Sequence, residues 1–318
     1  MDESTYPTMQ TLGNLFNEDR FQDFYDLSWD DDYPVGSPEN PAKPEQGQFS
    51  NTPPTNYQFT KSEPLETGGY DWLELSFYGE WDEKAFLSIA ATLDDAKAAA
   101  AESGSGFILE MGGQEVLVSP SGAKRGMYCS WVFEWQGMEI GIVNRSSYMA
   151  NSYNIHLAIR SMACMELGGR VAYDMACDFI KSLGLKIRSN KISRVDVCVD
   201  MSGVSTHEIG QAYKDHKFVS RPRKRTYYEE GYVCTGFDRG SGKRIKIRVY
   251  DKVRELKDSV KNDLKREILI KKRWGGIVKE ATRIEFQLRR EAIKDFDIDS
   301  VEEFFKRASE VTKWLTTK

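Results

Sequence analysis

Three segments in the C-terminal half of the chain alternate regularly between apolar and polar residues. They span residues 193–200, 244–250 and 283–289. Successive side chains of a β-strand point to opposite faces, so each segment predicts a strand with one apolar face and one polar face. Together they predict a sheet that packs helices against its apolar face and leaves the other face polar. The apolar rows would consist of Val195, Val197 and Val199, of Ile245, Ile247 and Val249, and of Ile284, Phe286 and Leu288.

The rest of the chain predicts further strands and helices in irregular alternation. Helices are indicated where apolar positions recur at helical spacing, and their ends are marked by glycines such as Gly104 and Gly184 or by the capping-box spacing of Ser300 and Glu303. The connections are too short for repeated βαβ crossovers, so we expect an α+β fold with an antiparallel or mixed sheet. The expected strands are 70–75, several short ones within 107–145, and 155–167, and the expected helices are 81–101, 171–183, parts of 252–274 and the segment after Ser300.

Charge and proline content divide the chain into two parts. Residues 1–68 hold eight of the ten prolines and carry 13 acidic and 3 basic side chains, whereas the remainder carries 36 acidic and 41 basic side chains. A segment of the first kind cannot bury enough apolar surface to fold alone, so we expect a disordered acidic tail. Residues 69–318 are expected to form the folded region, with an N-terminal half at 69–190 and a C-terminal half at 191–318.

Cysteine spacing and the N-terminus indicate the compartment. The five cysteines are scattered and include no C-x-x-C pair, which argues against a disulfide framework or a zinc ribbon and favours a reducing environment. The N-terminus has no basic stretch followed by an apolar one, and no window approaches the roughly 18 apolar residues of a membrane span. We therefore expect a cytoplasmic protein that does not bind membranes.

The polar rows of the three predicted strands bring carboxylates together. Asp196 and Asp200 follow Arg194 on one face of the first strand, and Glu285 lies on the polar face of the third. Carboxylate oxygens are the usual ligands of hard cations such as Mg²⁺ and Mn²⁺. A solvated outer face with salt bridges would give the same alternation, and Glu166, a fourth candidate ligand, is equally compatible with a surface ion pair.

Basic residues are concentrated around the second of these strands. Residues 217–275 contain 19 basic and 8 acidic side chains, with Tyr227, Tyr228 and Tyr232 interleaved. Arginine and lysine neutralise phosphates, and aromatic rings stack on unpaired bases, so this composition favours a nucleic-acid partner. The candidate DNA-binding residues are Arg194, Arg221, Arg223, Lys224, Arg225, Arg244, Lys246, Arg283 and Arg289.

Tyr250 ends the polar row of the second strand and is a candidate nucleophile. A phosphodiester can be cut by a nucleophile that becomes covalently attached, which conserves the bond energy for later rejoining. A phenol must first lose its proton, and its ordinary pKa is about 10. A cation held by the carboxylates would polarise the scissile phosphate, and Arg248 or Lys252 could stabilise the charge that develops in the transition state.

These motifs resemble those of the replication initiation factor family, which contains the Rep_trans-type rolling-circle initiators of plasmids and phages and related relaxases of integrative elements. The resemblance extends from about Tyr70 to Leu315 and leaves the acidic tail outside. The motifs that carry it are, in chain order, M-E-L-G-G at 165–169, R-x-D-x-x-x-D at 194–200, R-x-Y-D-K-x-x-E at 248–255 and R-x-E at 283–285.

The resemblance implies an endonuclease that nicks and rejoins DNA to initiate rolling-circle replication. In that family the tyrosine of the R-x-Y-D-K segment cuts one strand at the origin and leaves a 5′-phosphotyrosine bond and a free 3′-hydroxyl, and here it would be Tyr250. The resemblance also implies a Mg²⁺ or Mn²⁺ site built from Asp196 and Glu285, with Glu166 and Asp200 as further candidates. The implied partners are origin DNA with a hairpin or single-stranded nick site, a host helicase and a second copy of the chain.

The absence of a His-x-His pair and of a P-loop limits the possible metal sites and activities, but it does not select one reaction. The three histidines form no His-x-His pair, so a metal site would depend on carboxylates. Residues 236–243 lack the ending of a P-loop, so unwinding would require a separate helicase. Two alternatives stay open: a metal-dependent nuclease in which water attacks, and a non-catalytic origin-binding protein in which Asp196 and Glu285 pair with arginines.

Overall fold

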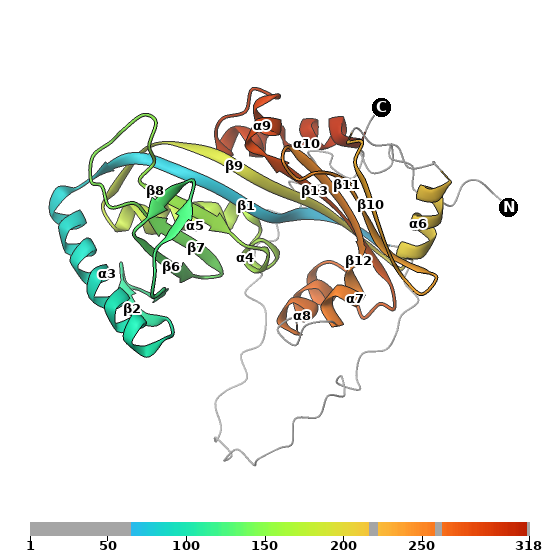
Figure 1. Cartoon of the computed structure of the whole chain (residues 1–318), viewed down its shortest axis with the longest axis horizontal. Coiled ribbons are helices and arrows are strands. Elements are labelled where there is room, and N and C mark those ends of the chain that lie inside the picture. Colours follow the sequence, from blue (N-terminus) through green and yellow to red (C-terminus); the bar gives the residue numbers. More distant parts are fainter. Residues whose placement is uncertain (1–64, 216–221, 258–262, 317–318) are drawn as a thin grey trace, which may run out of the picture.

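The computed structural model describes residues 65–215, 222–257 and 263–316, which form one large antiparallel sheet with helices around it and a separate two-stranded hairpin (Figure 1). The expectation of an α+β fold built on an antiparallel sheet is confirmed. The expected acidic tail lies outside the described residues, except for its last four residues, which begin β1. The strands are β1 (Leu65–Trp81), β2 (Phe107–Met111), β3 (Gln114–Val118), β4 (Ala123–Arg125), β5 (Met127–Cys129), β6 (Trp131–Trp135), β7 (Met138–Ile142), β8 (Ile155–Ile159), β9 (Leu185–Ser202), β10 (Arg225–Glu230), β11 (Val233–Gly240), β12 (Ile245–Asp251) and β13 (Ala281–Arg289). The helices are α3 (Glu83–Ser103), α4 (Ser161–Glu166), α5 (Gly169–Ser182), α6 (Thr206–Lys214), α7 (Lys252–Lys257), α8 (Asp263–Lys272), α9 (Arg290–Lys294) and α10 (Val301–Thr316).

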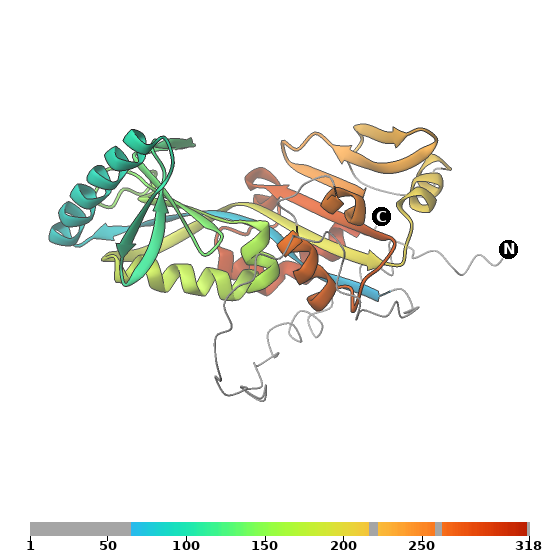
Figure 2. The same ribbon diagram turned by 90° about the horizontal axis from the view of Figure 1, so that it is seen from below.

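Two long strands join the two halves of the sheet. β1 and β9 pair antiparallel along their whole length, from Leu65 opposite Ser202 to Trp81 opposite Leu185. The order of the eleven strands is β10-β11-β12-β13-β9-β1-β8-β7-β6-β3-β2, so the central pair lies between two sets of shorter strands. Figure 2 shows β1 and β9 crossing the molecule from one set to the other. The sheet is therefore continuous through both halves of the chain.

The two halves repeat one topology, although the sequence shows no internal repeat. Each half begins with a long strand and a helix and ends with a strand followed by two helices. In the first half these are β1 and α3, then β8, α4 and α5. In the second half they are β9 and α6, then β13, α9 and α10. In each half the first strand pairs with the last one, and the earlier strands follow outward in descending order. The fold thus consists of two similar units that meet at the β1–β9 pair.

Helices cover the apolar face of the sheet, as the alternating pattern predicts. The predicted inward rows of β9, β12 and β13 are buried, except for the partly buried Ile245, together with the corresponding rows of β1, β7 and β8. In the first half Phe86 of α3 packs edge-on against Trp131, and in the second half Tyr213 of α6 stacks on Phe237, with ring centroids 4.1 Å apart. Burial of this apolar surface provides the main stabilisation of the fold.

Three further helices, α4, α7 and α8, lie on the opposite, polar side. They form a second, smaller apolar cluster in which Met165, Leu256 and Leu269 are buried. The prediction of one strand over 155–167 is therefore wrong in its second half, because the strand ends at Ile159 and α4 begins two residues later. The helix is favoured because Met165 packs against α7 and α8, and the local alternation of apolar and polar residues gives no information about that contact.

The predicted helix ends are confirmed. Gly104 closes α3 in the left-handed conformation, with φ of 66°. At the start of α10 the Ser300 hydroxyl accepts a hydrogen bond from the Glu303 amide at 3.2 Å, and the Glu303 carboxylate accepts one from the Ser300 amide at 3.0 Å. This reciprocal pair is the capping box that the spacing predicts.

All five cysteines are free thiols. Over the residues that the structure describes, no helix is both long and apolar enough to cross a membrane.

The core beneath the polar face can be tested at Phe286, a fully buried residue of β13. Replacing it by Ala should lower the free energy of unfolding by about 3–5 kcal/mol, because a large cavity would remain between the sheet and its helices. Urea denaturation measures this loss. Leu264→Ala, at an exposed apolar position of α8, is the control and should cost less than about 1 kcal/mol. Equal effects at the two positions would contradict the assignment of Phe286 to the core.

Candidate active site on the polar face of the sheet

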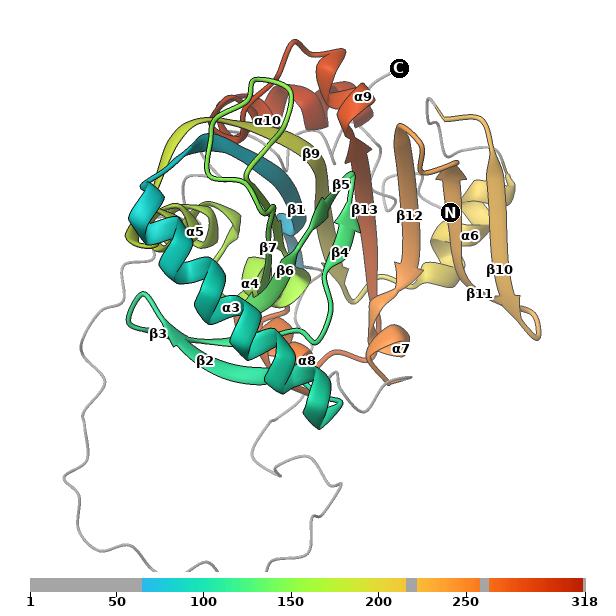
Figure 3. The ribbon, with the colours of Figure 1, turned by 60° about the vertical axis from the view of Figure 1, so that its left-hand side comes forward.

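The three alternating segments lie next to one another as β12, β13 and β9 (Figure 3). Their register places Arg248 opposite Glu285, and Tyr250 opposite Arg283, which in turn faces Asp200. Directly opposed side chains on adjacent strands lie on the same face. The separate polar rows therefore form one surface, which we call the tyrosine face. It consists of Lys246, Arg248 and Tyr250 of β12, of Arg283, Glu285, Gln287 and Arg289 of β13, and of Arg194, Asp196, Cys198 and Asp200 of β9.

Glu285 connects the central groups of the tyrosine face. One of its carboxylate oxygens accepts a hydrogen bond from the Tyr250 hydroxyl at 3.1 Å, and the other lies 3.2 Å from Nη1 of Arg248. Glu285 is only 2% exposed, whereas the Arg248 side chain is 44% exposed, and its guanidinium lies 5.2 Å from the centre of the Tyr250 ring. A phenol, a carboxylate and a solvent-accessible cation are thus in mutual contact.

The surroundings of Tyr250 keep its phenol protonated. Burial raises the pKa of Tyr250 well above its usual value; the positive charge of Arg283 opposes this rise and the negative charge of Glu285 adds to it. The phenolic proton is directed at Glu285. Use of the oxygen as a nucleophile would require this proton to move to a base, and Glu285 is within hydrogen-bond reach.

Asp196 is the second buried carboxylate of the tyrosine face. Its Oδ1 accepts a hydrogen bond from Nε of Arg194 at 2.8 Å, and its Oδ2 accepts one from Nη2 of the same guanidinium. Burial raises the pKa of Asp196 to about 7; the bond with Arg194 opposes this, and the negative charges of Glu285 and Asp71 reinforce it. Asp196 therefore sits where additional positive charge would be favourable.

Asp196 and Glu285 are the carboxylates best placed to hold a divalent cation. Asp196 stands opposite Gln287, two residues from Glu285, so the two acids are diagonal neighbours with Cβ atoms about 7 Å apart or less. Within the described residues, no group of three or more Cys, His, Asp or Glu side chains is arranged to hold a metal. The donor set fits Mg²⁺ or Mn²⁺ if water and a substrate phosphate complete the coordination, as is usual for Mg²⁺.

The structure does not bring the other two candidate ligands, Asp200 and Glu166, into this pair. Asp200 is fully buried and holds the guanidinium of Arg283 through two hydrogen bonds of 2.5 and 2.8 Å. Glu166 is exposed at the end of α4, and its backbone oxygen accepts a hydrogen bond from Lys272. Asp200 thus neutralises the charge of Arg283, and Glu166 faces solvent.

Arg283 is the centre of a buried charge network beneath Tyr250. Besides its two bonds with Asp200, it donates a hydrogen bond of 2.7 Å to Asp71 of β1. Asp71 also accepts one of 2.9 Å from Ser161 of α4, and Arg273 lies 3.5 Å from Asp200. Although burial alone would raise the pKa of Asp71, the neighbouring cations, with Arg283 foremost, lower it to about 2. The network therefore joins β13, β9 and β1 through charged groups, and the Ser161 hydroxyl attaches α4 to it.

The chain turns from β12 into α7 directly after Tyr250. Asp251 accepts a hydrogen bond of 2.9 Å from the Arg254 amide, and so caps the start of α7. Lys252 is buried, pairs with Glu255 at 2.7 Å and lies 5.5 Å from the centre of the Tyr250 ring. Burial and the charge of Arg283 lower the pKa of Lys252. Lys252 therefore contributes a shielded positive charge close to the phenol.

The basic residues expected to bind DNA are distributed over both faces of the sheet. Arg194, Lys246 and Arg289 join Arg248 at the accessible part of the tyrosine face, while Arg283 is buried beneath it. The remaining ones lie elsewhere: Arg223 and Lys224 are exposed before β10, Arg225 points to the opposite face, Arg244 precedes β12 and pairs with Asp295, and Arg221 lies outside the described residues.

Two site residues, Asp71 and Trp72, are not indicated by the sequence pattern. Regular alternation would place Asp71 on the same face as Leu73, yet a register shift after Tyr70 lets it reach Arg283. The same shift places Trp72 opposite Asp196, with the guanidinium of Arg194 4.9 Å from its ring centre. A bulge arises from pairing with a distant strand, so the local sequence carries no signal for it.

The buried network can be tested at Asp200. Replacing it by Asn should lower the free energy of unfolding by about 3 kcal/mol, because the guanidinium of Arg283 would lose its bidentate partner in a dry environment. Urea denaturation gives the value. Glu80→Gln, which breaks the exposed pair with Arg188, is the control and should cost less than about 1 kcal/mol. A stable Asp200→Asn protein with altered Mn²⁺ binding would instead make Asp200 a metal ligand.

Comparison with known protein families agrees with the motifs of the tyrosine face. Residues 172–307, which include β9, β12 and β13, match the family model for the N-terminal region of a replication-associated protein. Among solved structures, the chain is similar to the rolling circle replication initiator protein from Geobacillus stearothermophilus, with 18% sequence identity, coverage of 79% of each chain and a TM-score of 0.40. No protein of curated function matches the chain. The family match supports the replication initiator family that the motifs indicate.

Proposed function

We propose that this protein is a rolling-circle replication initiator that nicks and rejoins one DNA strand through Tyr250. The observation that carries the proposal is the contact of the Tyr250 hydroxyl with Glu285, whose second oxygen contacts the accessible Arg248. In this proposal Tyr250 is the nucleophile, Glu285 the proton acceptor and Arg248 the phosphate-binding cation, and their mutual contact supports these roles. The match of residues 172–307 to the family model of a replication-associated protein also supports a role in replication for the strands around this cluster.

In the proposed reaction, the Tyr250 oxygen attacks the phosphorus of the scissile phosphodiester. The bond from phosphorus to the 3′-oxygen breaks, the 5′-phosphate becomes attached to Tyr250, and the 3′-oxygen leaves as a hydroxyl after taking up a proton. Glu285 is within hydrogen-bond reach to accept the phenolic proton. Attack by that 3′-hydroxyl on the phosphotyrosine reverses the step and rejoins the strand.

A divalent cation, Mg²⁺ or Mn²⁺, would be held by Asp196 and Glu285. It would polarise the scissile phosphate and offset the charge that develops during attack. Arg194, bound to both oxygens of Asp196, orients that carboxylate, and Arg248 is exposed enough to contact the phosphate. Lys252 acts at longer range through its positive charge beside the phenol.

The accessible part of the tyrosine face is suited to single-stranded DNA. Lys246, Arg248, Arg194 and Arg289 supply cationic groups, each paired with a carboxylate in the free protein, and Trp72 supplies an aromatic ring beside Asp196. Such a combination binds backbone phosphates and unstacked bases. We therefore propose origin DNA with an exposed nick site as the substrate. A separate helicase would unwind the duplex, and a second copy of the chain would be a further partner.

The nucleophile can be tested with Tyr250→Phe. This change should lower the rate of nicking of a single-stranded hairpin substrate by roughly 10³-fold or more, because the attacking oxygen is removed while the ring remains. Denaturing gels and mass spectrometry of the covalent adduct provide the measurement. Tyr228→Phe is a matched control, since Tyr228 lies on the same face and donates a hydrogen bond to Asp238 at 2.8 Å.

The outcomes separate the three candidate functions. An adduct mapped to Tyr250, lost in Tyr250→Phe and retained in Tyr228→Phe, would support the proposal. Cleavage without any adduct would indicate a nuclease in which water attacks. Binding of origin DNA that is indifferent to a chelator, without cleavage of any strand, would indicate an origin-binding protein.

The metal site can be tested with Asp196→Ala and Glu285→Gln. Each should raise the Mn²⁺ concentration needed for half-maximal nicking by about tenfold or more, because one of two protein ligands is lost. Asp238→Asn is the control, since this carboxylate lies on the same face but pairs with Lys246. An unchanged Mn²⁺ titration in either variant would argue against that residue as a ligand.

A further inference from the structure

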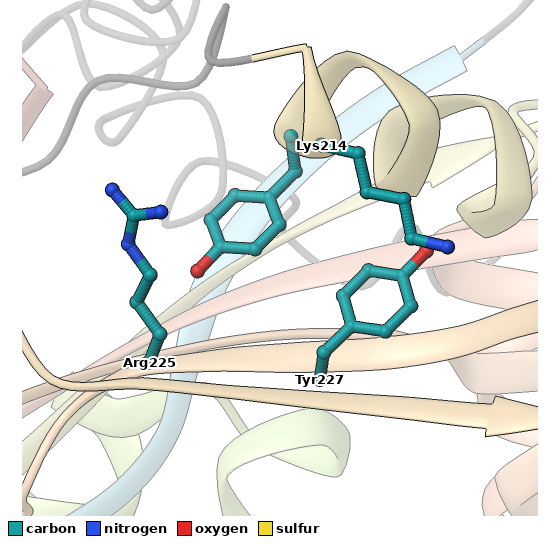
Figure 4. A pocket seen from close by; sticks show the side chains of 4 residues that line it. Lys214, Arg225 and Tyr227 are labelled. Atoms are coloured by element: carbon teal, nitrogen blue, oxygen red, sulfur yellow. The ribbon is translucent and has the colours of Figure 1, made fainter.

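A basic, aromatic pocket lies on the side of the sheet opposite the tyrosine face (Figure 4). It is lined by Tyr213 and Lys214 of α6 and by Arg225 and Tyr227 of β10, and its volume is about 430 Å³. Tyr227 stands opposite Phe237, which stands opposite Val249 in the apolar row of β12. Because side chains alternate between faces, Tyr227 and Tyr250 point to opposite sides. The proposed nicking reaction therefore does not use this pocket.

Two nearly parallel tyrosine rings form its aromatic part. The rings of Tyr213 and Tyr227 have centroids 6.1 Å apart and planes inclined by 8°, and Tyr213 is held in place by stacking on Phe237. Tyr227 remains partly exposed. Tyr213 is thus fixed by the core, and the partly exposed Tyr227 beside it can stack on a base without losing much conformational freedom.

Positive charge surrounds these rings. The Lys214 ammonium lies 4.5 Å from the centre of the Tyr227 ring, and the guanidinium groups of Arg225 and Arg239 lie 6.0 and 5.9 Å from that of Tyr213. Lys214 pairs with Glu229 at 2.5 Å, whereas Arg225 is exposed and forms no ion pair with any described residue. Lys214, Arg225 and Arg239 thus bring positive charge to the rings, and the exposed Arg225 favours an anionic aromatic ligand.

The pocket also lies next to the edge of the sheet. β10 is the last strand on its side, and its consecutive residues Tyr227 and Tyr228 point to opposite faces. Tyr228 belongs to the same side as Tyr250, because both stand opposite Gly236. A flexible strand that leaves the tyrosine face therefore has to cross only β10 to reach the pocket.

From these observations we infer that the pocket binds a nucleotide of single-stranded DNA, with the base against Tyr227 and the phosphates at Arg225 and Lys214. Its volume is within the range of small-ligand sites. A duplex is disfavoured because its stacked bases offer no free face to a tyrosine ring, whereas single strands do. This inference rests on the proposed DNA-nicking function, and it gives the strand a second attachment point away from the nick.

Strand binding by pocket variants tests the inference. The chain carrying Tyr250→Phe, which removes turnover, is titrated onto a fluorescent oligothymidine strand and anisotropy is measured. Adding Tyr227→Ala or Arg225→Gln should raise the Kd by roughly fivefold or more, because a stacking partner or a phosphate contact is lost. Tyr232→Ala is the control on the same hairpin: its side chain is 95% exposed, and the Kd should stay within about twofold.

The inference is overturned if Tyr227→Ala and Arg225→Gln both leave the Kd within about twofold of the parent value. Arg225 is exposed, so Arg225→Gln tests the pocket even if Tyr227→Ala fails to fold. Oligothymidine with a photoreactive base should also crosslink to Tyr227 in the parent chain, and crosslinking only to the tyrosine face would contradict the inference.

Nicking assays separate this inference from the proposed function. Nicking of a saturating short substrate by the parent chain, with Tyr250 intact, tests the reaction by itself, because the pocket is remote from the reacting atoms. If the parent chain does not nick but the pocket variants still weaken strand binding, the proposed reaction fails and the pocket remains a DNA site. If nicking occurs and strand binding is unaffected, the pocket inference alone fails.

Discussion

The buried charge of Arg283 is the constraint on which the tyrosine face depends. An unpaired guanidinium in a dry interior would cost several kcal/mol, so the fold must supply Asp200 and Asp71 at its sides. These ion pairs hold β13 against β9 and β1, and the hydrogen bond between Asp71 and Ser161 attaches α4 to the same strands. Because Tyr250 stands opposite Arg283 in the sheet, the same network sets the position of the proposed nucleophile.

The two halves share a topology but differ in the residues at corresponding positions of the described strands. Leu73 of β1 and Val195 of β9 pair with each other and occupy equivalent positions in the two halves. With this alignment, Glu285 of β13 is equivalent to His156 of β8. Arg248, the partner of Glu285, is equivalent to Gly141, the partner of His156. The first half therefore has the strands of the second half without its chemistry. It contributes the long strand β1, which supplies Asp71 and Trp72 to the face built by the other half, and helix α4, whose Ser161 donates a hydrogen bond to Asp71.

The proposed DNA path passes around the edge strand β10, from one face of the sheet to the other. On one side lie Tyr250, its carboxylates and the accessible arginines, and on the other lie the paired rings of Tyr213 and Tyr227. A single strand held on both sides of the edge, as we propose, would not slide freely across the nick site. Phosphate contacts on the tyrosine face and stacking contacts in the pocket would then position one strand together.

The sequence by itself determined the strands, their two faces and the cluster of chemical groups that they carry. Period-two alternation is a local property, so the inward row of Phe286 and the outward row of Tyr250 and Glu285 follow from it directly. Local pattern could not separate four candidate carboxylates, because pairing across strands decides which acids meet an arginine and which meet each other. Only the tertiary structure bound Asp200 to Arg283, left Glu166 at a helix end and brought Asp71 in through a bulge. The contact of Asp200 with Arg283 and the bulge at Asp71 depend on the register between strands that are distant in the chain, with Asp200 and Arg283 83 residues apart, and no local spacing encodes that register.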